Sequence, residues 1–127
     1  IADLIIKYRG FAISSEYIRR DTEGAPVTKS GTSTRYIITG DGVNTQLSYC
    51  FKSNWEIAAR HSLVTPHNDI ILLQNQINQY GLGVTKYIVK HKLKAQFNIF
   101  YNNERYLTTS TNLVDNFFGV FQVELGI

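Results

Sequence analysis

The sequence predicts an all-β protein, and more specifically a transmembrane antiparallel up-and-down β-barrel. Three observations lead to this prediction. Apolar and polar residues alternate over most of the 127 residues. The connections between the alternating stretches are short and long in turn, and aromatic residues gather at both ends of the apolar face. Successive side chains of a strand point to opposite faces, so alternation with a period of two indicates strands.

Composition excludes several other classes of protein. No apolar run approaches the ~18 residues of a membrane-spanning helix. The net charge of +3 is too small to indicate nucleic-acid binding. Cys50 is the single cysteine, which excludes a domain stapled by internal disulfides. The chain lacks a signal peptide and does not begin with Met, so we expect a mature chain or a fragment, and at most one domain.

The first two expected strands cover residues 2–9 and 11–20, joined by a two-residue turn at Arg9-Gly10. Residues 23–34 carry Gly24, Pro26 and Gly31 and are expected to form a long loop. The next strand is expected over residues 35–51, with a bend or bulge at Gly40-Asp41-Gly42.

Residues 43–63 are the clearest hairpin, because alternation continues on both sides of Lys52-Ser53-Asn54. A polar three-residue turn suits an antiparallel connection. Centring the hairpin on Ser53 places Arg60 opposite Gln46. The remaining expected elements follow in order: a second long connection over 65–74, a strand over 75–88, a turn at Val89-Lys90, a strand over 91–101, a third long connection over 102–115 and a last strand over 116–127.

This order gives seven strands, no helix, and connections of alternating length. Transmembrane barrels have short turns on the periplasmic side and longer loops outside, and strands of about 9–11 residues cross a bilayer when they are tilted. Seven strands leave two open edges, which lipid does not tolerate, so we expect further strands upstream of residue 1.

Aromatic residues are expected in two belts at the lipid interfaces. One belt lies beside the short turns and the other toward the long loops. Their members are Tyr8, Phe11, Tyr49, Phe51 and Trp55 near the turns, and Tyr17, Tyr80, Tyr101 and Phe117 near the loops.

The opposite face is rich in Asn, Gln, Ser, Thr and Gly, and we expect it to line a water-filled lumen. Its basic residues are candidate contacts for anions, because positive side chains in a pore attract them. These residues are Arg60, Lys94, Arg20, Lys7 and Arg9. The competing interpretation is that such charges pair with acids on neighbouring strands, and that Lys7 and Arg9 form a solvated rim near a turn.

The sequence contains no catalytic motif and no spacing of its three histidines that suggests a metal site, so we expect neither an enzyme nor a metal or other cofactor. Gly81-Leu82-Gly83 matches no phosphate-binding loop, and we expect these glycines to admit close neighbouring side chains.

Three stretches together resemble the phosphate-selective porin O/P family of outer-membrane porins, in the form found in Bacteroidota. They are GVNTQLSYCFKSNWEIAAR, NQYGLGVTKYIVKHKLKAQFNIFY and the closing FQVELGI, and the segment from Asn54 to Arg60 is the most specific. The resemblance implies a barrel of roughly sixteen strands, of which residues 1–127 would be the C-terminal portion. It also implies location in the bacterial outer membrane, a homotrimer or larger assembly, and passive uptake of small anions such as phosphate.

We therefore expect a porin-like channel whose partners are outer-membrane lipid and small solutes or anions. Two alternatives stay open at this stage. One is a structural barrel subunit of a larger outer-membrane complex without an open pore. The other is a soluble ligand-binding β-barrel, which also alternates but with its apolar residues inside.

Overall fold

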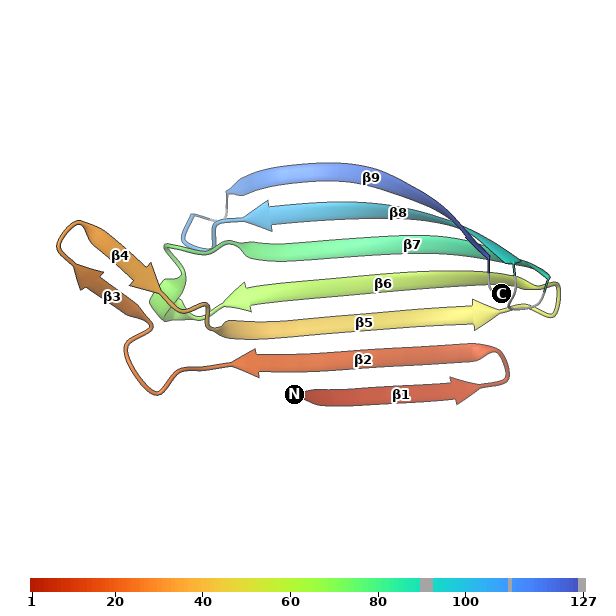
Figure 1. Cartoon of the computed structure of the whole chain (residues 1–127), viewed down its shortest axis with the longest axis horizontal. Helices are drawn as coiled ribbons and strands as arrows, with labels where there is room; N and C mark the ends of the chain where they lie inside the picture. The colour runs from red at the N-terminus through yellow and green to blue at the C-terminus, as the bar shows by residue number, and fades with distance from the viewer. Residues whose placement is uncertain (90–92, 110, 126–127) are drawn as a thin grey trace.

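The structure, a computed structural model, describes residues 1–89, 93–109 and 111–125. This part of the chain is all-β, and seven strands form one antiparallel sheet in the order β1-β2-β5-β6-β7-β8-β9. The strands are β1 (Ala2–Tyr8), β2 (Phe11–Arg20), β5 (Gly40–Cys50), β6 (Trp55–Pro66), β7 (Gln76–Val89), β8 (Leu93–Arg105) and β9 (Asn112–Leu125). Figure 1 shows them side by side in a single curved layer.

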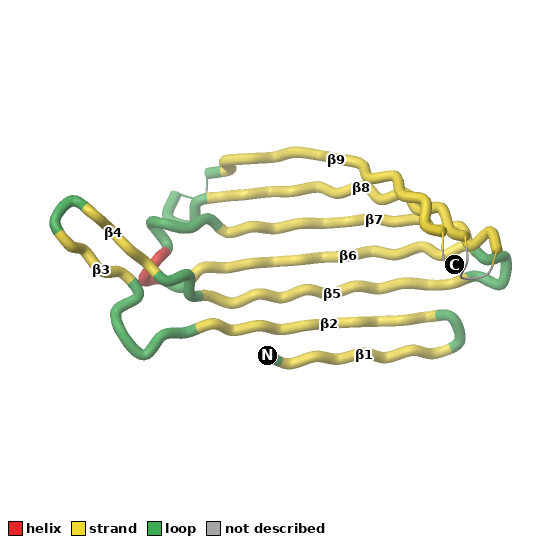
Figure 2. Tube along the Cα trace, viewed as in Figure 1, coloured by secondary structure: helices red, strands yellow, loops and turns green. Residues whose placement is uncertain are grey.

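The two ends of the sheet differ, as Figure 2 shows. The longer connections lie at one end. They carry a separate hairpin of β3 (Val27–Ser30) and β4 (Ser33–Tyr36), and a single 3₁₀ turn, η1 (Asn68–Ile70). The turns β1–β2 and β5–β6 lie at the opposite end. None of the described segments is a helix with the length and apolarity needed to cross a membrane.

Two of the three expected short turns are confirmed. Arg9 and Gly10 both adopt positive φ, 46° and 87°, as a two-residue hairpin turn matching the strand twist requires. In the β5–β6 hairpin Gln46 pairs with Arg60, so the turn does centre on Ser53. Asn54 closes that turn with a φ of 60°, a conformation that Asn tolerates better than most residues. The expected turn at Val89-Lys90 is not confirmed as placed: Val89 belongs to β7, and residues 90–92 lie outside the described part.

The expected loop over residues 23–34 is wrong in part. Val27 pairs with Tyr36 and Thr28 with Arg35, so β3 and β4 form a hairpin of their own. Arg35 consequently does not begin the sheet strand, which starts at Gly40. Gly24, Pro26 and Gly31 interrupt this segment, but Val, Thr and Tyr favour extended backbone, and they suffice for a four-residue pairing.

The expected bulge at Gly40-Asp41-Gly42 is also wrong, because β5 pairs with β2 and with β6 in unbroken register through these residues. Glycine at position 40 has a different cause. A Cβ added there would collide with the carbonyl oxygen of Thr65 on the next strand.

The third connection is much shorter than expected, spanning 106–111 rather than 102–115. Polar side chains extend the pairing of β8 with its neighbours. Asp115 accepts hydrogen bonds from Tyr101 and from Asn103, and Arg105 Nε donates to Gln76 Oε1 at 2.8 Å. These cross-strand bonds offset the low intrinsic strand preference of Asn and Asp.

Burial is unusual for a sheet of this size. Ile70 of η1 is the only hydrophobic residue in the described part that is buried, whereas most of the large apolar side chains of the sheet are exposed. The described chain therefore covers neither face of its main sheet.

The Gly10 turn gives a first prediction. Gly10→Ala should lower the free energy of unfolding by about 1–3 kcal/mol, because a side chain is strained at positive φ. Its Cβ would also lie 2.6 Å from the carbonyl oxygen of Cys50. Denaturant titration followed by the fluorescence of Trp55 measures the change. Gly24→Ala is the matched control, since nothing lies within 4 Å of its Cβ. Equal midpoints for the two variants would contradict the prediction.

Candidate functional site: the polar face of the sheet

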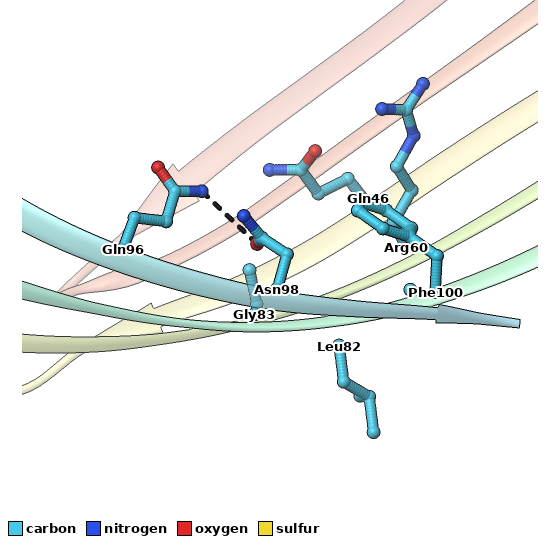
Figure 3. A pocket seen from close by; sticks show the side chains of 9 residues that line it. Gln46, Arg60, Leu82, Gly83, Gln96, Asn98 and Phe100 are labelled. Carbon is cyan, nitrogen blue, oxygen red and sulfur yellow. Dashed lines mark hydrogen bonds between the residues drawn. The ribbon is translucent and has the colours of Figure 1, made fainter. Parts of the chain in front are cut away.

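Strict register keeps side chains of one kind on one face of the sheet. In one row across the strands, Leu47 pairs with Ala59, Ala59 with Leu82 and Leu82 with Ile99. In the neighbouring row, Gln46 pairs with Arg60 and Arg60 with Gly81. Figure 3 shows Gln96, Asn98 and Phe100 on one side of the sheet and Leu82 on the other. We call these sides the polar face and the apolar face.

The apolar face does not converge into a dry interior. Residues expected on it are exposed by 41% to 65% on five different strands. They are Leu47, Ile57, Leu82, Phe97 and Val123. No second layer of the described part covers them.

The polar face is the more crowded one. In β7, Gly81, Gly83 and Thr85 are buried, whereas the intervening Leu82 and Val84 are 65% and 40% exposed. Side chains converge on the concave side of a bent layer and diverge on its convex side. The polar face is therefore the inner side of the curved sheet.

The two glycines of β7 make this crowding feasible. A Cβ at Gly81 would lie 2.7 Å from the ring of Phe100, and a Cβ at Gly83 would collide with the side-chain oxygen of Asn98. The expectation that these glycines admit close neighbouring side chains is confirmed. They form the floor of a hollow of about 140 Å³ that Arg60, Gln46, Gln96 and Asn98 also line (Figure 3).

Arg60 lies at the centre of this polar face and is held from one side. Its Nε donates to Asn44 Oδ1 at 3.0 Å, and Ser62 Oγ donates to the same oxygen at 2.8 Å. No carboxylate of the described residues comes within ion-pair distance of the Arg60 guanidinium. The Arg60 charge is therefore not compensated by an ion pair within the described part of the chain.

The other four basic candidates have different surroundings. Lys94 forms an ion pair with Glu124 at 2.9 Å, so its charge is compensated. Arg9 lies in the β1–β2 turn, with its guanidinium carbon 5.2 Å from the centre of the Tyr8 ring, which favours a rim position. Lys7 is opposite Ala12 near the same turn, and Arg20 is opposite Gly40 at the loop end.

The charges on the polar face nearly cancel. Register places four basic and five acidic side chains of the described strands on it. They are Lys7, Arg20, Arg60 and Lys94, and Asp3, Glu16, Glu56, Glu104 and Glu124. A preference for anions would therefore depend on where single charges lie and not on their sum.

The aromatic residues expected near the turns do gather on the apolar face at that end. Tyr8 pairs with Phe11 and Phe11 with Tyr49, and Phe51 contacts Tyr49 edge-on at 4.8 Å between ring centres. The ammonium of Lys86 lies 4.7 Å from the centre of the Trp55 ring.

Most of the second group forms a continuous row toward the loop end. His61 stacks on Tyr80 at 4.7 Å, Tyr80 on Tyr101 at 6.4 Å, and Tyr101 contacts Phe117 at 4.6 Å. Tyr17, on β2, lies apart from the row and donates a hydrogen bond to Asp41.

Sequence reasoning missed the apolar residues on the polar face. Ile18, Val64 and Ile77 lie there near the loop end, and Phe100 stacks on Phe118 at 5.0 Å near β9. Each of these residues is separated from polar-face residues of its own strand by an even number of positions. This separation was the signal that could have revealed them. Among the described residues, no three His, Cys, Asp or Glu side chains gather so as to hold a metal ion.

Comparisons with known proteins identify no relative. No family model, no curated protein and no solved structure matches this chain. The resemblance to the phosphate-selective porin O/P family stays a prediction.

The glycine floor gives a second prediction. Gly81→Ala should lower the free energy of unfolding by about 1–3 kcal/mol through overpacking against Phe100. Combining it with Phe100→Ala should recover much of this penalty, which a double-mutant cycle measures. Gly119→Ala is the control, since its Cβ would meet the Phe97 ring at an ordinary 3.6 Å. Additive penalties for Gly81→Ala and Phe100→Ala would contradict the close approach.

Proposed function

We propose that this chain forms part of the wall of a porin-like β-barrel in a bacterial outer membrane, through which small solutes diffuse passively. One observation carries the proposal. The inner side of the curved sheet bears the amide, hydroxyl and charged side chains, and the outer side bears exposed aliphatic and aromatic ones. A soluble barrel has the opposite arrangement, whereas a barrel in lipid requires this one.

Strand length and aromatic placement support the same proposal. The strands β2 and β5 to β9 have 10 to 14 residues, enough for the about 9–11 that a tilted strand needs to cross a bilayer. Aromatic side chains at both ends of the apolar face suit the two lipid–water interfaces, where their rings are partly hydrated.

The sheet needs further strands to close. β1 and β9 each pair on one side only within the described part, and open edges cannot face lipid. In the proposal, additional strands complete a barrel of roughly sixteen, and homotrimers or a larger assembly follow from the family resemblance.

Transport in this proposal requires no chemical step. Water fills the lumen, and the side chains that line it set the local potential. Arg60 is the candidate contact for an anion such as phosphate, because Asn44 orients its guanidinium and no described carboxylate pairs with it.

The orientation of the sheet can be tested at two adjacent residues. Gln46→Cys and Leu47→Cys, each in a Cys50→Ser background, place a thiol on opposite faces of β5. In protein reconstituted into lipid vesicles, a charged, membrane-impermeant thiol reagent should label position 46 and leave position 47 unlabelled. Both side chains are exposed in the sheet itself, so a difference would report lipid. Labelling at position 47 alone would overturn the proposal.

Arg60 gives a separate prediction about selectivity. A unit charge about 6 Å from a passing ion in water is worth about 0.7 kcal/mol, or about threefold in relative permeability. Arg60→Gln should lower the anion-to-cation permeability ratio by about this factor, as measured from reversal potentials in planar bilayers.

Lys86→Gln is the matched control for Arg60→Gln. It removes the same charge from the apolar face, where the Lys86 ammonium also donates to the Ser53 carbonyl oxygen at 3.0 Å. The control should leave the ratio unchanged. Equal effects of the two substitutions would remove Arg60 from the proposed pathway.

A second candidate function is a structural barrel without an open pore. One patch of the polar face near β9 is apolar, where Phe100 stacks on Phe118 and Val120 is 39% exposed. Such a patch suits a packed segment better than water. Suppose that the reconstituted protein is inserted in the membrane, as shown by its resistance to added protease, but conducts no ions. That result would favour this candidate over the channel.

A further inference from the structure

A separate cavity lies on the polar face at the loop end, away from Arg60. Its volume is about 250 Å³. Register aligns Ile18, Gly42, Val64 and Ile77 in one row across β2, β5, β6 and β7. The three aliphatic side chains are 40%, 47% and 41% exposed, and Ile38 of the preceding connection is 54% exposed. An apolar cluster of this kind is costly on a face bathed only by water.

The space between these aliphatic side chains exists because position 42 is a glycine. Gly42 occupies the row between Ile18 and Val64, and a Cβ added there would meet nothing closer than 3.9 Å. Side chains as large as those of its neighbours would fill the gap.

Hydrogen bonds link the connections beside the cavity to one another. The backbone N–H of His67 donates to the Thr39 carbonyl oxygen at 3.1 Å, and Gln74 Nε2 donates to the Tyr36 hydroxyl at 2.9 Å. Thr39 lines the cavity with only 1% of its surface exposed, and its hydroxyl has no hydrogen-bond partner among the described residues.

Of the two charged side chains that line the cavity, the positive one has no partner of opposite charge in the described part of the chain. These two residues are Arg20 and Asp41. The carboxylate of Asp41 accepts from the Tyr17 hydroxyl and lies 3.1 Å from His67 Nε2, both outside the cavity lining. Arg20 forms no ion pair within the described part of the chain.

We infer that this cavity binds a small amphipathic carboxylate, with an apolar body between Ile18, Val64 and Ile77 and a carboxylate on the Arg20 guanidinium. The volume is just below the roughly 300 Å³ at which pockets for drug-sized ligands begin, which limits the body to about one six-membered ring. The site uses residues of the loop end and does not depend on whether Arg60 contacts a solute.

Cyclohexanecarboxylate is a suitable probe, because it is ionised and water-soluble at neutral pH. Isothermal titration of the purified full-length protein, in the medium that keeps it monodisperse, should give saturable binding. Gly42→Leu should abolish binding by filling the cavity. Arg20→Gln should weaken it about tenfold, in proportion to a lost charge-assisted hydrogen bond. The neutral cyclohexylmethanol should bind the wild type and Arg20→Gln equally.

Gly119→Leu is the matched control, a similar substitution in a strand but on the apolar face, and it should bind as the wild type does. Circular dichroism and unfolding midpoints establish that each variant folds. Arg20 is exposed, so its variant provides the test if Gly42→Leu does not fold. The inference is overturned if the wild type shows no saturable binding, or if a folded Gly42→Leu or Arg20→Gln binds as tightly as the wild type.

Discussion

The structure depends on backbone pairing in constant register. A shift of one residue between two strands would move every side chain of the shifted strand to the other face. In β5, β6 and the central part of β7 the register runs without interruption, and the register shifts in the described part lie at strand ends, near Val89 and Arg105. One layer can thus present two chemically different surfaces. No packed core contributes to this choice, because the described sheet covers neither of its faces.

The sequence was sufficient for the β5–β6 hairpin because three signals agree there. Alternation, turn chemistry at Asn54 and the strand preference of Tyr, Phe and Trp all favour the same register. The ends of the strands were harder to predict from the sequence. Pairing around Asp115 depends on hydrogen bonds from Tyr101 and Asn103, residues that are distant in sequence. A period-two pattern does not contain that information. The β3–β4 hairpin was missed because Gly24, Pro26 and Gly31 indicate a loop, although Val27, Tyr36 and the three Thr residues between them favour extended backbone.

The candidate site was predicted less completely than the fold. Position alone placed Arg60 opposite Gln46, and pairing confirms this. Position in the sequence could not predict that Lys94 pairs with Glu124, or that the Arg9 guanidinium lies over the Tyr8 ring. Curvature is also invisible in a pattern of alternation, and it decides that the polar face is the crowded one. The aliphatic row of Ile18, Val64 and Ile77 requires four strands in register before its members meet.

The order of strands in the sheet also bears on how the molecule assembles in time. Each main strand pairs with the next main strand along the chain, and the β3–β4 hairpin is the single detour among the described segments. Loop closure between neighbours costs little conformational entropy, and only logarithmically more as the connection lengthens. The sheet can therefore grow by adding one strand at a time to an existing edge. Every intermediate of such a route ends in an exposed edge that offers itself to the following strand and, equally, to a wrong one.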